Sequence, residues 1–159
     1  MASQLDTYSG ACGCGQLVYQ LSSAPLFVHC CHCTECQKQT GSAYVLNALI
    51  EADRVTWNGD ATVHMLATPS GKGQQITRCA ACGTAVFSNY LVRLGKLRFV
   101  RVGTLDNPEL CPPDVQIFTS SKQPWVPLST EIPSFEKFYE FKDVWPADAF
   151  KRLSTLFET

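Results

Sequence analysis

The chain has 159 residues, of which 45% are hydrophobic and 17% are charged, a composition typical of one globular domain with a moderate core. Its 13 Lys and Arg residues and 14 Asp and Glu residues give a formal net charge of -1, which argues against nucleic acid as a partner. No apolar run approaches the roughly 18 residues of a membrane span, and residues 1–6 do not resemble a secretory leader, so we expect a cytoplasmic protein with no membrane partner.

Short apolar segments separated by turn residues predict strands along most of the chain. Leu17, Tyr19 and Leu21 alternate with polar residues, as in a half-buried strand. A short helix is predicted near 34–39, and the apolar run 43–50 predicts a buried strand. Further segments with strand character follow at 54–57, 62–68, 74–78, 85–88, 97–102 and 115–119.

The last third of the chain combines a loop with a helix. Segment 105–114 contains three prolines, which predict a loop. A helix is predicted to start at Pro146, with Phe150, Leu153 and Phe157 on one face. No repeat, low-complexity tract or linker interrupts the pattern, so we expect one mainly β domain with short helices.

Seven of the nine cysteines lie in three tight clusters. Spacings of one or two residues place two thiolates on one metal ion. An odd number of cysteines in a chain without a secretory leader argues against a disulfide framework. The sequence therefore predicts two zinc ions per chain, held by Cys12-Gly-Cys14, Cys31-His-Cys33-Thr-Glu-Cys36 and Cys79-Ala-Ala-Cys82.

Two cysteine pairs form a complete ligand set, here called the four-cysteine site: Cys12, Cys14, Cys79 and Cys82. Four thiolates suit a structural zinc ion in a tetrahedron, and the glycines beside them let backbone amides approach the sulfurs. A redox dithiol is the alternative for Cys79 and Cys82 alone, but no thioredoxin-like βαβ pattern surrounds them. Metal binding at such a site contributes to folding.

The remaining cluster, here called the three-cysteine site, comprises Cys31, Cys33 and Cys36. Three thiolates leave one position on a zinc ion open, the arrangement of a catalytic metal. A thiol is a suitable fourth ligand, because zinc binds sulfur readily and promotes loss of the thiol proton. These three cysteines are therefore the candidate catalytic residues.

The fourth ligand of the three-cysteine site is not decided by the sequence. Cys30, His29 or His32 can close the site and make both zinc ions structural, although residues next to a ligand usually point away from the same ion. We expect His32 to face solvent, His29 and His64 to be ordinary strand or loop histidines rather than ligands, and Cys111 to be a bystander thiol. Five cations are candidates to meet a ligand carboxylate, although surface charge is the default expectation for each: Lys38, Lys72, Arg98, Arg101 and Lys122.

Several motifs occur in a fixed order: Gly10-Ala-Cys12-Gly-Cys14-Gly15, Cys31-His-Cys33-Thr-Glu-Cys36-Gln-Lys38 with Gly41, Arg78-Cys79-Ala-Ala-Cys82-Gly83, Val100-Arg-Val-Gly-Thr-Leu-Asp106, Gln116-Ile-Phe118, Ser121-Lys122, Trp125 and Phe135. Together they resemble the glutathione-dependent formaldehyde-activating enzyme family, which includes centromere protein V. The resemblance covers about residues 8–140. It leaves a C-terminal helical segment, at about 144–157, outside the motifs.

The resemblance implies a single zinc-bridged domain over residues 1–159, built from several small twisted antiparallel sheets. It also implies a second zinc ion on the three-cysteine site. The family's named activity joins glutathione to formaldehyde to give S-hydroxymethylglutathione and is classed as a carbon–sulfur lyase. We therefore expect a zinc-dependent lyase that acts on glutathione or a related thiol adduct, with glutathione as co-substrate.

A second class of function is a non-catalytic module with two structural zinc ions that binds protein or chromatin. The resemblance to centromere protein V supports it, whereas the balanced charge and the lack of a basic tail argue against direct binding of nucleic acid. A zinc buffer is a third, weaker interpretation.

Overall fold

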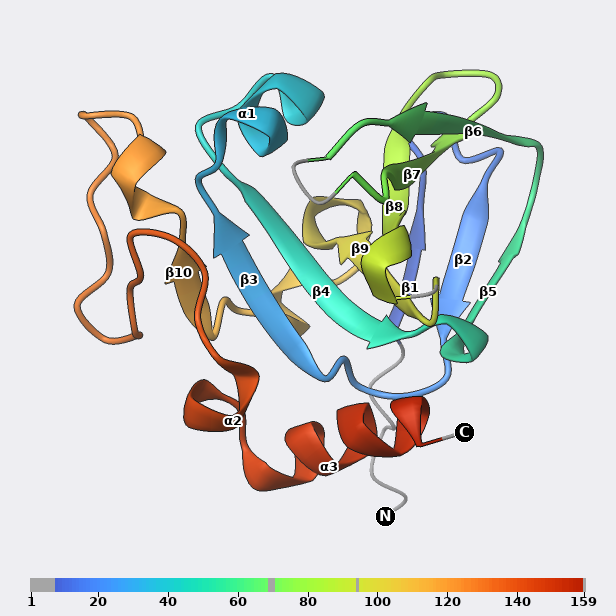
Figure 1. The fold of residues 1–159 in the computed structure, drawn as a ribbon. Coiled ribbons are helices and arrows are strands. Elements are labelled where there is room, and N and C mark those ends of the chain that lie inside the picture. Colours follow the sequence, from blue (N-terminus) through green and yellow to red (C-terminus); the bar gives the residue numbers. More distant parts are fainter. Residues whose placement is uncertain (1–7, 69–70, 94, 159) are drawn as a thin grey trace, which may run out of the picture.

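The computed structural model describes residues 8–68, 71–93 and 95–158. In this part of the chain the strands form two sheets, one of three strands and one of seven, and two of the helices lie at the C-terminal end (Figure 1). The predicted fold class, mainly β with short helices, is confirmed. None of the described helices is long and apolar enough to cross a membrane.

The small sheet is antiparallel, with the strand order β1 (Tyr8–Ala11), β2 (Val18–Leu21), β5 (Val55–Asn58). Tyr19 and Leu21 are buried, whereas the alternate residues of β2 are exposed, which confirms the predicted half-buried strand. The sequence did not predict β1, a four-residue strand of mixed composition.

The large sheet has the strand order β10-β3-β4-β9-β8-β7-β6, and every neighbouring pair is antiparallel except β10 and β3. Its β3 strand was missed by the sequence analysis, because a fully buried strand lacks the alternation of polar and apolar residues. The strands are β3 (Phe27–Cys31), β4 (Val45–Glu51), β6 (Ala61–Leu66), β7 (Gln74–Cys79), β8 (Ala85–Tyr90), β9 (Leu97–Arg101) and β10 (Val115–Ile117).

Three α-helices occur in the described residues: α1 (Thr34–Thr40), α2 (Phe141–Val144) and α3 (Ala147–Phe157). Helix α1 ends where predicted, because Gly41 takes a left-handed conformation (φ 63°) and its N–H bonds the Gln37 carbonyl. Short 3-10 helices lie at Ala52–Arg54, Leu91–Arg93, Val102–Thr104, Pro108–Leu110 and Thr119–Ser121.

The hydrophobic core lies on both faces of the large sheet, and residues of β4 belong to both parts of it. Ala48 and Ile50 pack into a cluster that contains the buried residues of the small sheet. Val45 and Leu49, on the opposite face of β4, pack into a cluster with residues of the C-terminal helices. Because successive side chains of a strand point to opposite faces, one strand contributes to both halves of the core.

Aromatic contacts hold the C-terminal segment against β3. Trp145 donates from Nε1 to the Tyr139 hydroxyl (2.7 Å), which donates to His29 Nε2 (2.6 Å). Burial lowers the pKa of His29 to about 3, so its neutral ring acts as the acceptor. Phe27 stacks on Trp145 with ring centroids 5.1 Å apart. His29 is therefore a core histidine bonded to Tyr139.

The turn between β5 and β6 passes from the small sheet to the large one at Gly59. This residue has a φ of 112°, and a Cβ atom built there would lie 2.1 Å from the Gln16 carbonyl oxygen and 2.8 Å from Leu17 Cα. Only glycine fits, since both the backbone conformation and the close approach exclude a side chain. The turn thereby supports the loop that carries the first cysteine pair.

We predict that Gly59→Ala lowers the free energy of unfolding by more than about 2 kcal/mol, because the methyl group forces the two loops apart. Urea denaturation measures the loss. Gly71→Ala is the matched control: Gly71 also has a positive φ, 72°, but a Cβ there meets nothing within 4 Å. That control should cost only about 1 kcal/mol. Equal losses in the two variants would contradict the close packing at Gly59.

Candidate metal centres

The four-cysteine site joins the β1–β2 loop to the end of β7. The Sγ atoms of Cys12, Cys14, Cys79 and Cys82 all lie within 4.8 Å of one another, with separations of 3.5 Å between Cys12 and Cys14 and 3.8 Å between Cys14 and Cys79. A tetrahedral zinc ion with Zn–S distances of about 2.3 Å requires sulfurs about 3.8 Å apart. All nine cysteines are free of disulfides. The donor set therefore fits a metal ion.

The two loops of this site have matching backbone geometry. In each, the N–H of the first cysteine, Cys12 or Cys79, bonds the carbonyl five residues later, at 2.9 and 3.0 Å. In each, a glycine with φ near 75°, Gly15 or Gly83, returns its N–H to the carbonyl of that first cysteine, at 3.0 and 2.9 Å. Glycine is needed at both positions because a left-handed residue closes the turn.

Hydrogen-bond donors surround the sulfurs. The Leu17 amide donates to Cys12 Sγ at 3.3 Å. The Thr84 hydroxyl accepts from the Gly13 amide (3.2 Å) and lies 3.2 Å from Cys82 Sγ, where its hydrogen bond lowers the pKa of that thiol to about 5. Thr84 thus connects the two loops and favours the thiolate form of Cys82, as a metal ligand requires.

The three-cysteine site lies at a strand-to-helix junction. Cys31 is the last residue of β3, Cys33 caps the N-terminus of α1, and Cys36 lies in the first turn of that helix. Their Sγ atoms lie within 4.8 Å of one another, and the Cys36 amide donates to Cys33 Sγ at 3.3 Å. Cys31 and Cys36 are buried and Cys33 is half-buried, whereas the four-cysteine site combines two buried residues, Cys12 and Cys79, with two exposed ones, Cys14 and Cys82. The two sites therefore differ in the number of cysteines, and only the four-cysteine site has fully exposed members.

No fourth His, Cys, Asp or Glu atom of the described residues joins this group of three sulfurs. Cys30 Sγ instead lies 3.5 Å from His32 Nε2, and His29 is bonded to Tyr139. The expectation that His32 faces solvent is wrong. Its side chain is 1% exposed, because the ring packs 5.3 Å from that of Tyr44, and its Nδ1 has no hydrogen-bond partner.

The three thiols have unequal acidity. Hydrogen bonds from Cys31 and Cys36 lower the pKa of Cys33, and the bond to Cys33 raises the pKa of Cys31. For Cys36, the hydrogen bond with Cys31 lowers the pKa, and the Arg101 guanidinium lowers it further by a smaller amount. The hydrogen bond with Cys33, burial and the Cys33 charge act in the opposite direction and raise the pKa to about 12. Burial, followed by the charges of these cysteines, raises the pKa of Tyr90. Arg101 and Tyr90 therefore lie within electrostatic reach of the site.

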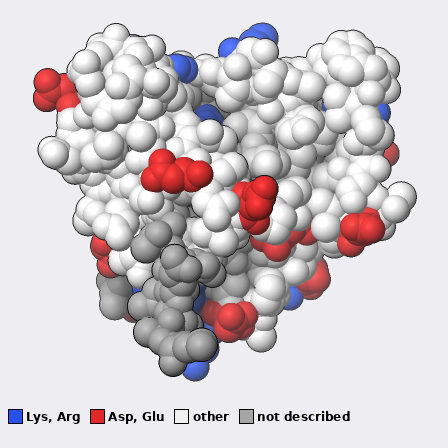
Figure 2. Space-filling view, turned by 180° about the vertical axis from the view of Figure 1, so that it is seen from behind, with Lys and Arg blue, Asp and Glu red and all other residues white. Residues whose placement is uncertain are grey.

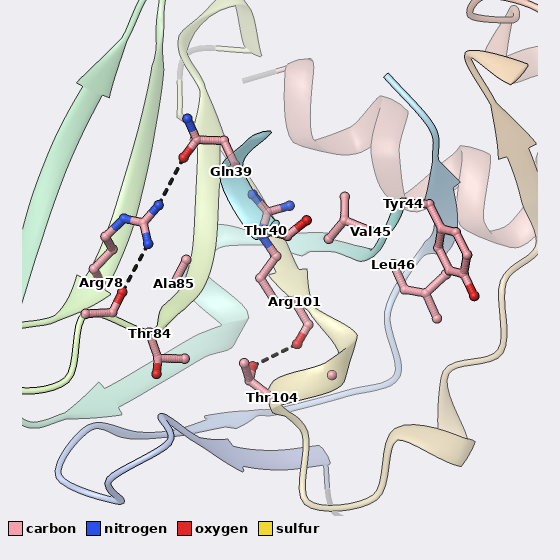
Figure 3. A pocket seen from close by; sticks show the side chains of 12 residues that line it. Gln39, Thr40, Tyr44, Val45, Leu46, Arg78, Thr84, Ala85, Arg101 and Thr104 are labelled. Atoms are coloured by element: carbon pink, nitrogen blue, oxygen red, sulfur yellow. Dashed lines mark hydrogen bonds between the residues drawn. The ribbon is translucent and has the colours of Figure 1, made fainter. Parts of the chain in front are cut away.

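A pocket of about 470 Å³ is lined by segments that adjoin both cysteine sites, and Figure 3 shows its side chains. On one side, Thr40 bonds the Cys36 carbonyl from its hydroxyl (2.8 Å), and Val45 pairs with Cys31 in the sheet. On the other side the wall includes a loop of the four-cysteine site. The lining residues are Gln39, Thr40, Tyr44, Val45, Leu46, Arg78, Gly83, Thr84, Ala85, Arg101, Gly103 and Thr104.

The cations proposed to meet a carboxylate have different surroundings. Lys38 fits the surface expectation, since its side chain is 75% exposed and lies 3.8 Å from Glu35. Arg98 is partly buried, with its guanidinium 4.7 Å from the centre of the Trp57 ring. For Arg101 the surface expectation is wrong, because it ends an interior strand of the large sheet and is only 6% exposed.

The sequence analysis missed one cation of the pocket, Arg78. It donates from Nη1 to the Gly83 carbonyl and from Nη2 to Gln39 Oε1, both at 3.0 Å. The sequence did offer one signal for this residue. Arg78 directly precedes Cys79, and neighbouring residues of a strand point to opposite faces, so the Arg78 side chain is expected on the face opposite to Cys79. Arg78 therefore spans from the four-cysteine site to α1 across the pocket wall, as Figure 3 shows.

Comparison with known proteins identifies a family. The model of the glutathione-dependent formaldehyde-activating enzyme family matches residues 7–121, which include both cysteine sites. A solved structure of a Rhodobacter sphaeroides protein from a structural genomics project is similar, with a TM-score of 0.49 and 13% identity over 79% of this chain and 98% of that chain. Among curated proteins no relative of the chain is found.

We predict that the four-cysteine site controls folding. Cys82→Ser leaves an incomplete ligand set, so the variant should hold about one metal equivalent fewer and lose several kcal/mol of unfolding free energy. Metal analysis and thermal melts with and without a chelator measure both effects. Cys111→Ser is the control, since Cys111 is buried but belongs to neither site. A Cys82→Ser protein with the metal content and melting temperature of the wild type would contradict the assignment.

Proposed function

Because the chain belongs to the glutathione-dependent formaldehyde-activating enzyme family, we propose that it is a zinc-dependent carbon–sulfur lyase acting on glutathione or a related thiol adduct. The observation that carries the proposal is the difference between the two cysteine groups. Four sulfurs lie close enough together to make a complete ligand set for one ion, whereas the three buried or half-buried sulfurs have no fourth protein ligand among the described residues. Thr40, which bonds the Cys36 carbonyl, and Val45, the sheet partner of Cys31, line the pocket.

In this proposal the four-cysteine site holds a structural zinc ion, and Cys31, Cys33 and Cys36 hold a second one. When bound there, zinc supplies a Lewis acid that lowers the pKa of a coordinating thiol. The three cysteines are fixed by a strand end and a helix start, so their geometry changes little when the substrate arrives.

The proposed reaction joins a thiol to an aldehyde carbon. The glutathione sulfur forms a bond to the carbonyl carbon of formaldehyde, and the thiol proton is transferred to the carbonyl oxygen, which gives S-hydroxymethylglutathione. The lyase direction breaks the same carbon–sulfur bond and returns the proton to sulfur. The pocket contributes by positioning the thiol next to the three-cysteine site, since the gain expected from the protein is orientation of the two reactants.

The partner in this proposal is a small-molecule thiol, and the setting is the cytoplasm, where thiols stay reduced. The formal net charge of -1 agrees with a small-molecule partner rather than a nucleic acid. On the face shown in Figure 2, Lys and Arg are scattered and form no continuous basic patch of the kind that binds nucleic acid. A two-zinc module for protein partners is the alternative that the following experiments separate from the enzyme.

We predict that Cys33→Ser loses thiol-dependent lyase activity by at least about 100-fold while the fold survives, since the four-cysteine site is untouched. Activity is assayed with glutathione and formaldehyde and with several glutathione adducts, alongside circular dichroism. Cys30→Ser is the matched control, because Cys30 lies one residue from Cys31 but outside the group of three sulfurs. Full activity of Cys33→Ser would remove the site from catalysis, and unfolding of the variant would favour the binding module.

A cobalt-substituted protein provides a second test. Co²⁺ absorption in the visible range depends on its ligands, so we predict that millimolar glutathione changes the spectrum as its sulfur takes the remaining position at the three-cysteine site. In Cys33→Ser the change should be lost or strongly altered. A wild-type spectrum that stays the same with glutathione would show that no thiol reaches the metal, and the binding module would then be the better interpretation.

A further inference from the structure

The pocket shown in Figure 3 has a strongly biased charge. Two arginines, Arg78 and Arg101, belong to its lining, and the lining contains no Asp or Glu. Neither arginine forms an ion pair with a carboxylate of the described residues. Two cations at one small cavity repel each other, so the arrangement favours a bound anion.

Arg101 is the more unusual of the two. Its side chain is 6% exposed, and Nη1 donates to Oδ1 of Asn47, a buried neighbour on β4. Its Nε is buried without a hydrogen-bond partner. A buried guanidinium with an unused donor is costly, because the group has lost water and gained no acceptor in return. A ligand that supplies an acceptor and a negative charge removes both deficits.

Arg78 is held in place from two sides. Its bonds to the Gly83 carbonyl and to Gln39 Oε1 fix the guanidinium plane, and they use only two of its five N–H donors. Figure 3 shows Arg78 and Arg101 on neighbouring parts of the pocket wall, with Gln39 and Thr40 of α1 beside them. The planar fork of an arginine matches a carboxylate better than any other side chain does.

The position of the pocket relates the arginines to the three-cysteine site. Thr40 contacts the carbonyl of Cys36, and Val45 is the sheet partner of Cys31. A ligand with its anionic end at the arginines can therefore extend towards the three sulfurs. A volume of about 470 Å³ is in the range that holds a molecule of tripeptide size.

We propose that this pocket recognises carboxylate groups, and that Arg101 and Arg78 select an acidic thiol or thiol adduct as the substrate. Only the direction of the sulfur towards the three-cysteine site rests on the proposed function. The recognition of the anion depends on the two guanidinium groups alone. Thiols without a carboxylate are accordingly poor ligands, even though their sulfur is equally suited to the metal.

Isothermal titration calorimetry with S-methylglutathione tests the proposal, because this molecule keeps both carboxylates and has no free thiol. We expect it to bind the zinc-loaded wild type, and its dimethyl ester to bind at least about tenfold more weakly. Arg101→Gln and Arg78→Gln should each raise the Kd for S-methylglutathione by about tenfold or more. Lys38→Gln is the control, since it removes a cation of α1 that does not line the pocket.

Several outcomes would overturn the proposal: no binding of S-methylglutathione at millimolar concentration, equal binding of acid and ester, or an equal loss in Lys38→Gln. If Arg101→Gln has a lower melting temperature than the wild type, the proposal is tested with Arg78→Gln and the charge-retaining Arg101→Lys instead. An unchanged Kd for S-methylglutathione in both of these variants would also overturn the proposal. Metal content is measured for every variant, because Arg78 precedes Cys79. A wild type that binds S-methylglutathione through the two arginines but shows no lyase activity would contradict only the proposed function.

Discussion

The convergence of four cysteine sulfurs at one point is the constraint on which the rest of the structure depends. It joins the loop between β1 and β2, in the small sheet, to the end of β7, in the large sheet. These segments are 65 residues apart at Cys14 and Cys79, and the cluster fixes their relative position. The binding free energy of a structural zinc ion, about 10–16 kcal/mol in peptides, is large relative to the net stability of a domain.

The same connection shapes the pocket. Gly83 and Thr84 belong to the second loop of the four-cysteine site and also line the cavity. The Thr84 hydroxyl contacts the Cys82 sulfur, and the Gly83 carbonyl accepts a hydrogen bond from Arg78. The four-cysteine site and the pocket therefore share one loop, so a change in the backbone of this loop alters both.

The three-cysteine site is built differently, by local structure. A buried strand ends, the chain turns, and a helix of seven residues begins, all within six residues of sequence. The helix start supplies the Cys36 amide that bonds Cys33 Sγ. Both elements are packed into the core, and the junction between them is also held by residues 117–121, because Ser121 donates from Oγ to the His32 carbonyl and Gln37 donates from Nε2 to the Ser121 carbonyl.

The sequence by itself determined the features that depend on short-range geometry. Cysteine spacing separated a set of four from a set of three, Gly41 ended α1, and alternation identified β2. Tertiary structure decided the features that depend on strand register and packing. It buried His32 and Arg101, placed Arg78 across from α1, and kept Cys30 out of the group of three sulfurs. The physical reason is that ligand spacing is a property of a few consecutive bonds, whereas burial and the pairing of a charge depend on which distant segments lie beside it.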